Sequence, residues 1–127
     1  MLNEWTTSGM GVEKLRVRSP SVVAGRLTLL DCGRPWLQMI DVYVEPSFRG
    51  RGLGRLLLSL AMRRALAVGK LRIRLTCDDS GTGSLLAWYS RMGYYSVGVD
   101  SQARAILESG PCSRSMVCTA AHQTEEV

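Results

Sequence analysis

Three glycines and three arginines alternate over a short stretch in the first half of the chain, and together they could bind an anion. The stretch reads Arg49-Gly50-Arg51-Gly52-Leu53-Gly54-Arg55. Glycine lets backbone N–H groups approach a phosphate, and arginine donates paired hydrogen bonds to phosphate oxygens. An apolar helix pattern begins at Leu53, so the unpaired amides of a first helical turn fall in the same place. The stretch therefore predicts a pyrophosphate site at a helix N-terminus.

Two other phosphate-binding motifs do not fit this stretch. A dinucleotide-binding fingerprint, G-x-G-x-x-G, requires glycine where Arg55 stands, and a Walker loop requires Gly-Lys followed by Ser or Thr, which the chain lacks. A glycine turn without any ligand is the remaining alternative. The strand pattern before Pro46 and the three arginines weigh against it.

The longer segment around this stretch resembles the acetyl-CoA motif of the GCN5-related N-acetyltransferase (GNAT) family. It reads Val42-Tyr43-Val44-Glu45-Pro46-Ser47-Phe48-Arg49-Gly50-Arg51-Gly52-Leu53-Gly54. The resemblance implies acetyl-CoA as co-substrate, with no metal. It also implies that the strand backbone pairs with the pantetheine arm and that the loop amides hold the pyrophosphate. The implied cofactor-binding residues are Val42, Tyr43, Val44, Arg49, Gly50, Arg51, Gly52, Leu53, Gly54 and Arg55.

A tyrosine in the second half of the chain is the candidate general acid. Tyr89 precedes the pair Gly93-Tyr94 by four residues, as a helical tyrosine does in the GNAT family. The resemblance implies that Tyr89 protonates the thiolate of CoA as it leaves. The alternative is that Tyr89 is a core aromatic residue beside Trp88.

An acidic residue on the motif strand is the candidate general base. Asp41 lies three residues before Val44, and many members of the family carry an acidic residue on this strand. A lysine amine, with a pKa about 3.4 units above pH 7, gains more from a base than an α-amine does. Glu45 and Asp78 are weaker candidates, and Asp41 could equally be an ordinary solvent-facing residue.

These residues must be positioned by strands and helices, which the apolar periodicity places as follows. Strands are expected at residues 12–18, 22–30, 36–44, 71–77, 94–99 and 114–119, and helices at 53–68 and 84–92. The order predicts an α+β, GNAT-like domain over residues 12–119, with a mixed, mostly antiparallel sheet and two main helices. Residues 1–11 are expected to be a flexible N-terminus and residues 120–127 a flexible acidic tail.

The short N-terminal segment leads to two further expectations. Eleven residues are too few for the first strand and the helix pair that usually begin the family's fold, so we expect both to be missing. The acceptor side would then be open, and apolar side chains of residues 12–44 would be exposed. Because large exposed apolar patches are uncommon in monomers, the sequence predicts a homodimer.

Composition limits the remaining classes. The 127 residues suffice for one domain, and the net charge of +5 favours anionic ligands. No Cys-x-x-Cys pair occurs and His122 is the only histidine, so a metal site is not expected. We find no signal peptide and no long apolar run, which favours a cytoplasmic protein without membrane contact. Fourteen arginines leave nucleic-acid binding as a weak alternative, because they are scattered and only 6% of residues are aromatic.

The sequence thus predicts an enzyme that transfers an acetyl group from acetyl-CoA directly to an amine acceptor, with proteins and peptides among the possible acceptors. The alternative is a non-catalytic acyl-CoA-binding or regulatory module of the same fold.

Overall fold

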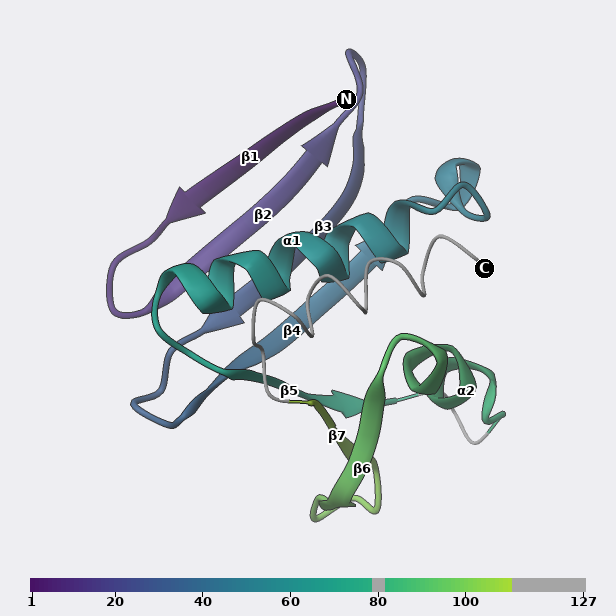
Figure 1. The fold of residues 1–127 in the computed structure, drawn as a ribbon. Coiled ribbons are helices and arrows are strands. Elements are labelled where there is room, and N and C mark those ends of the chain that lie inside the picture. The colour runs from purple at the N-terminus through teal and green to yellow at the C-terminus, as the bar shows by residue number, and fades with distance from the viewer. Residues whose placement is uncertain (79–81, 111–127) are drawn as a thin grey trace.

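In the part of the chain that the structure describes, seven strands form one mixed sheet with two α-helices packed on it (Figure 1). The computed structural model describes residues 1–78 and 82–110. The elements are β1 Leu2–Thr7, β2 Val12–Arg18, β3 Val23–Leu30, β4 Trp36–Val44, the 3₁₀ turn η1 Pro46–Phe48, α1 Leu53–Ala67, β5 Arg72–Cys77, α2 Ser84–Arg91, β6 Tyr94–Val99 and β7 Ala105–Ser109. The strand order is β1-β2-β3-β4-β5-β7-β6, and only β4 and β5 are parallel. The predicted α+β fold is confirmed.

Helix α1 lies across the middle of the sheet (Figure 1) and packs five buried residues against the apolar side chains of the strands. Its apolar stripe includes Leu53, Leu57 and Ala61, which are all buried, as the 3.6-residue periodicity predicts. The helix approaches β3 closely because Gly25 has no side chain. A Cβ atom at Gly25 would lie 3.0 Å from Cδ1 of Leu57. A larger residue at Gly25 would therefore push the helix away from the sheet.

Strand β4 contains a β-bulge. Arg26 on β3 pairs with Tyr43, whereas Thr28 pairs with Ile40, so β4 has one extra residue between these pairs. Asp41 lies in this bulge with a left-handed backbone, φ 55°. Left-handed φ values are accessible to aspartate with less cost than to most residues. The bulge changes the direction in which the end of β4 presents its side chains.

The sheet opens next to the bulge. Strands β4 and β5 pair over three positions only, from Trp36 with Arg72 to Gln38 with Arg74. Within the described residues, no strand pairs with this edge of β4 beyond Gln38, although β4 continues to Val44. Figure 1 shows β4 and β5 running apart, with α1 and β1–β4 on one side of the opening and α2, β6 and β7 on the other.

The prediction of a flexible N-terminus over residues 1–11 is wrong. Residues 2–7 form β1, which pairs with β2 from Leu2 opposite Arg18 to Thr7 opposite Glu13. The segment has weak apolar alternation of its own and is held by this pairing and by Trp5, whose ring lies under the guanidinium of Arg64 at 5.7 Å. A turn at residues 8–11 joins the two strands directly. The usual first strand is therefore present, and no helix lies between β1 and β2.

The last strand also differs from the prediction. The strand that pairs with β6 is β7, Ala105–Ser109, which the apolar pattern did not indicate. Strand β7 contains Glu108, a buried carboxylate, and a charged residue in a short segment suggests a loop. The strand expected at residues 114–119 and the tail at 120–127 lie outside the described residues.

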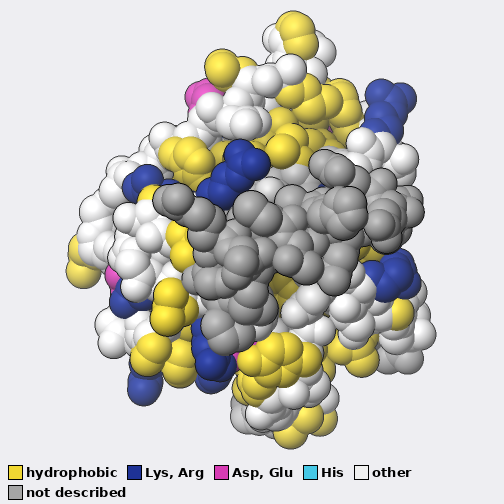
Figure 2. Space-filling view, in the orientation of Figure 1, with side chains coloured by type: hydrophobic (Ala, Val, Ile, Leu, Met, Phe, Trp, Pro, Cys, Tyr) yellow, Lys and Arg dark blue, Asp and Glu magenta, His cyan; other side chains and the backbone are white. Residues whose placement is uncertain are grey.

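The face of the sheet opposite α1 is charged rather than apolar. It carries the exposed or half-buried side chains of Lys14, Arg16, Arg18, Arg26, Arg72 and Arg74. On the α1 side, by contrast, Lys and Arg side chains lie scattered among hydrophobic ones (Figure 2). The exposed apolar surface from which a homodimer was predicted is therefore not the main feature of this face. Self-association stays a prediction, to be tested by light scattering.

Candidate functional site

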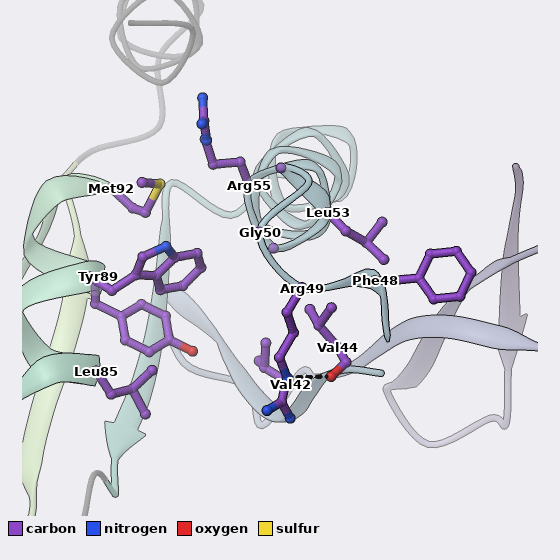
Figure 3. Close-up of a pocket in the computed structure, with 13 residues that line it drawn as sticks. Val42, Val44, Phe48, Arg49, Gly50, Leu53, Arg55, Leu85, Tyr89 and Met92 are labelled. Carbon is purple, nitrogen blue, oxygen red and sulfur yellow. Dashed lines mark hydrogen bonds between the residues drawn. The ribbon is translucent and has the colours of Figure 1, made fainter. Parts of the chain in front are cut away.

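A cavity of about 480 Å³ lies where the end of β4, the loop before α1 and helix α2 meet. It is lined by Val42, Val44, Phe48, Arg49, Gly50, Gly52, Leu53, Gly54, Arg55, Leu85, Trp88, Tyr89 and Met92. Figure 3 shows α2 contributing one wall and β4 with the glycine loop the other. The cavity is thus adjacent to the opening between β4 and β5, and its volume is within the range of small-molecule sites.

The loop between β4 and α1 folds through local hydrogen bonds. The carboxylate of Glu45 accepts a hydrogen bond from the backbone N–H of Ser47 at 2.9 Å, which starts η1. Arg49 then turns back, and its Nε donates to the carbonyl oxygen of Val44 at 3.0 Å (Figure 3). Gly50 and Gly52 follow with φ of 75° and 78°, values that favour glycine. This left-handed backbone directs the chain into α1.

The N-terminus of α1 has hydrogen-bond donors available for an anion. Gly52 is the N-cap and supplies no side-chain cap, and no acidic residue lies in the first turn. The first helical amide to bond back is that of Leu56, which donates to the carbonyl oxygen of Gly52 at 3.1 Å. The preceding amides have no intrahelical partner, and the helix dipole adds positive potential there. Arg55 lines the cavity at this end.

The three glycines of the loop have different roles. A Cβ atom at Gly50 or Gly52 would meet no protein atom within 4 Å, so the space beside both is open. A Cβ atom at Gly54 would lie 2.9 Å from Cζ2 of Trp88. Gly54 therefore allows the close packing of α1 against α2, whereas the sequence interpretation assigned it to phosphate approach. Trp88 in turn forms part of the cavity wall.

Tyr89 places its hydroxyl group in the cavity. Its ring is 4% exposed and makes edge contacts with Trp88 at 5.0 Å and with Tyr94 at 5.5 Å between ring centroids. Figure 3 shows the hydroxyl pointing from α2 toward Val42 on β4. Burial, with a smaller contribution from the nearby Cys77, raises the pKa of Tyr89 to about 12. The phenol is therefore protonated, and a hydrogen-bond donor, throughout the neutral pH range.

The structure brings most of the sequence-predicted residues together, with three exceptions. Arg51 does not line the cavity, and its guanidinium lies 5.7 Å from the ring of Phe48. Tyr43 points to the opposite face of the sheet, where Arg26 stacks on it at 4.6 Å. Asp41 is exposed and lines a different cavity on that face. These three side chains are thus not part of the cavity, although the backbone of Tyr43 remains on the open edge of β4.

Four lining residues were not among the predicted site residues. They are Phe48, Leu85, Trp88 and Met92. The periodicity of α2 places the last three on one apolar side with Tyr89, but an apolar helix face ordinarily indicates core. The close contact between Gly54 and Trp88, which only the structure shows, turns part of this face into a cavity wall.

Comparison with known proteins identifies the family. The sequence model of the acetyltransferase (GNAT) family matches residues 5–94, which include both walls of the cavity. The chain belongs to this family. As a GNAT protein it is an acyltransferase, and its fold is the one expected from the sequence resemblance. A search of curated proteins finds no match to this GNAT chain.

Solved structures with the same fold share little sequence with this GNAT protein. A putative acyl-CoA N-acyltransferase from Klebsiella pneumoniae has a TM-score of 0.71 at 24% identity, covering 81% of this chain and 74% of its own. PaiA N-acetyltransferase from Thermoplasma acidophilum, solved in complex with coenzyme A, has a TM-score of 0.70 at 20% identity, covering 80% and 62%. The ribosomal-protein-S18-alanine N-acetyltransferase from Escherichia coli has a TM-score of 0.66 at 17% identity, covering 84% and 72%.

Two further properties of the GNAT chain concern metals and membranes. Within residues 1–78 and 82–110, His, Cys, Asp and Glu side chains form no cluster of three that could hold a metal ion. Among the same residues, neither α1 nor α2 has the length and apolar composition of a membrane-spanning helix.

Proposed function

We propose that the protein transfers an acetyl group from acetyl-CoA directly to an amine acceptor, with an amine on a protein or peptide among the candidates. One observation carries the proposal. A single cavity joins the uncapped N-terminus of α1 to a buried, protonated tyrosine, and it lies beside a strand edge that no described strand pairs with.

The residues present fit acetyl-CoA. The amides before and within the first turn of α1, with Arg55 beside them, would hold the pyrophosphate. The edge of β4 near Val42 and Val44 would pair with the amides of the pantetheine arm, since no described strand occupies it. Leu85, Trp88 and Met92 supply apolar surface to the same cavity. Acetyl-CoA would contribute the activated thioester.

In the transfer, the neutral acceptor amine forms a C–N bond to the acetyl carbon and the C–S bond to CoA breaks. One amine proton leaves to water or to a base, and the departing sulfur gains one proton. Tyr89 is the donor that faces the cavity. Its pKa of about 12 exceeds that of a thiol, about 8.5, so complete proton transfer in advance would be uphill. Tyr89 therefore stabilises the departing thiolate by donating a hydrogen bond to the sulfur as negative charge develops on it, and the sulfur takes up its proton from water once the C–S bond has broken.

Asp41 is proposed to assist the loss of the amine proton. Its position in the β4 bulge makes it the chain neighbour of Val42, which lines the co-substrate cavity, while Asp41 itself faces the opposite side of the sheet. A base on that side would meet an acceptor that approaches from the charged face. Water molecules would carry the proton from the acceptor amine to the carboxylate of Asp41.

The test is CoA thiol release from acetyl-CoA with a panel of amines, read by a thiol reagent and by mass spectrometry of the acetylated amine. We expect acceptor-dependent release with formation of an amide. Tight binding of acetyl-CoA without amine-dependent release for any member of the panel would instead identify a non-catalytic acyl-CoA-binding module. The similar structures include a nourseothricin acetyltransferase and a ribosomal-protein-S18-alanine N-acetyltransferase, whose named acceptors differ, so the panel should be broad.

A further inference from the structure

A second cavity, of about 330 Å³, lies on the face of the sheet opposite α1. It is lined by Lys14, Leu15, Arg16, Val23, Arg26, Leu27, Thr28 and Asp41. Three of these side chains are cations and one is a carboxylate, and all four are exposed. The first cavity is mainly apolar, so the two cavities suit ligands of different chemistry.

The three cations of this cavity differ from the others on the same face. The others are paired with carboxylates, as Arg18 with Glu4, Arg72 with Glu108 and Arg74 with Glu108. Within the described residues, no ion pair or hydrogen bond is found for the side chains of Lys14, Arg16 or Arg26. Charge compensation is therefore incomplete at the cavity and present around it. Unpaired cations in a concave site are suited to bind an anion.

Two of these cations repel each other, and an anionic ligand between them would relieve the repulsion. Arg16 on β2 lies directly opposite Arg26 on β3, with Glu4 of β1, the partner of Arg18, on its other side, and like charges in direct cross-strand positions destabilise a sheet. Arg26 is held in place by stacking on Tyr43 at 4.6 Å. A carboxylate between the guanidinium groups would convert this repulsion into charge-assisted hydrogen bonds.

Asp41 connects this cavity to the proposed site of transfer. It lines the charged cavity, whereas Val42, the next residue, lines the co-substrate cavity on the other face. The backbone of the β4 bulge is thus the wall between the two. The sheet is open beside this wall, beyond Gln38 of β4, so an amine near Asp41 would reach the acetyl group through that opening, with the cations of β2 and β3 behind it.

We propose that the charged cavity recognises the acceptor, and that the acceptor is an amine that also carries a carboxylate. This inference rests on the proposed acetyl transfer. Asp41 holds the ammonium end before its deprotonation, and Lys14, Arg16 and Arg26 hold the carboxylate. A free amino acid and the N-terminus of an acidic peptide share this chemistry.

The experiment compares acceptors that differ only in charge. The probes are L-glutamate against L-glutamine amide, and the peptide Glu-Glu-Ala-Ala-amide against Gln-Gln-Ala-Ala-amide. Each is measured by acetyl-CoA thiol release and by calorimetric binding in the presence of CoA. We expect the carboxylate form to be favoured at least tenfold in kcat/KM or in affinity in one of the pairs. A preference for the carboxylate form in the first pair alone would indicate that the acceptor is an amino acid. A preference in the second pair alone would indicate that it is a peptide.

The variants Arg16→Gln and Arg26→Gln remove one cation each, and Arg18→Gln is the matched control on the same face. We expect KM for the favoured carboxylate to rise about tenfold or more in the first two and less than twofold in the control. CoA affinity and the rate with the uncharged probe should be unchanged in all three, which separates recognition from folding.

Two results would overturn the inference. One is equal use and equal binding of carboxylate and amide probes by the wild type. The other is a set of variants that lose retention of nonspecific DNA while their acceptor KM stays constant, which would assign the cations to nucleic acid. Failure of the proposed function is distinct, because it would abolish thiol release with every amine while calorimetry could still detect carboxylate binding.

Discussion

The α1 face of the sheet and the face opposite it carry different kinds of side chain, although β4 contributes to both. On the α1 face, buried apolar residues surround a cavity whose polar groups are backbone amides, Arg49, Arg55 and the hydroxyl of Tyr89. On the other face, charged side chains are exposed and some lack partners among the described residues. At the β4 bulge, the side chain of Asp41 faces the charged side of the sheet and that of the next residue, Val42, faces the α1 side.

This difference suggests a division of roles. In the proposed function, the backbone amides and the buried phenol would recognise the CoA moiety, which is common to every acceptor's reaction. Exposed charges can be exchanged without disturbing the core, so they suit recognition of the variable acceptor. Substitutions that disable one face and leave the other intact test this division of roles.

The largest effect is expected for Gly54→Leu. The new side chain would occupy the place of Trp88, since even a Cβ atom would lie 2.9 Å from its ring. Overpacking costs about 1–3 kcal/mol of stability, and displacement of Trp88 should lower CoA affinity by about 100-fold or more. Calorimetry with CoA and thermal unfolding measure the two quantities. Unchanged CoA affinity would show that the contact between α1 and α2 does not contribute to CoA binding.

Tyr89→Phe should lower kcat by about 100-fold, the usual scale for a lost proton or hydrogen-bond donor. Tyr43→Phe is the control, because that hydroxyl group is on the opposite face. In the wild type, the rate should show no loss attributable to Tyr89 ionisation below about pH 11, since its pKa is raised to about 12. If Tyr89→Phe keeps the wild-type kcat, the role of Tyr89 is structural and not catalytic.

The same tyrosine should make folding sensitive to alkali. Its folded-state pKa of about 12 is above the ordinary tyrosine value of 10.0, so the folded protein retains a proton that the unfolded chain loses. The stabilisation is complete below about pH 10 and is lost as pH rises toward 12, with a total of about 2–3 kcal/mol. In denaturant unfolding between pH 8 and 11, the free energy of unfolding should fall less for Tyr89→Phe than for the wild type. An equal fall in the free energy of unfolding of both proteins would contradict the raised pKa of Tyr89.

The sequence identified the first cavity well because its residues are close together in the chain. The glycine loop, the start of α1 and Tyr89 belong to two short motifs, each with its own local geometry. The apolar periodicity also located α1 and the first part of the sheet, since the pattern is regular there.

The sequence could not indicate features that depend on distant pairing. Strand β1 forms by pairing with β2, and β7 contains the buried Glu108, whose partners Arg72 and Arg74 lie more than thirty positions earlier. The bulge that turns Asp41 away from the first cavity depends on the register between β3 and β4. None of these pairings has a local sequence signal.

The paired cations of the charged face allow a smaller, graded test. Glu108 is 2% exposed; burial opposes its ionisation, but hydrogen bonds from Arg72 and Arg74 outweigh this and hold its pKa below the ordinary value. Glu108→Gln should cost about 1–2 kcal/mol near pH 7, because both guanidinium groups still reach water. Its cost should shrink as pH falls from the ordinary carboxyl value of 4.5 toward the lower pKa of folded Glu108, because the wild-type carboxylate then takes up its proton. Glu4→Gln, at an exposed pair with Arg18, should cost less than about 0.5 kcal/mol. Equal costs would show that burial does not distinguish the two pairs.

The smallest effect is expected for Gly52→Ala, compared with Gly33→Ala. Both glycines have left-handed φ, 78° and 74°, and a Cβ atom at either would meet no protein atom within 4 Å. Both substitutions should therefore cost about 1 kcal/mol of stability through backbone strain alone. Only Gly52 lies in the predicted pyrophosphate site, so only Gly52→Ala should also weaken CoA binding, by about tenfold. Because the strain is matched, the difference in affinity isolates the contact with phosphate. If both variants bind CoA equally, the open space beside Gly52 is not where the pyrophosphate lies.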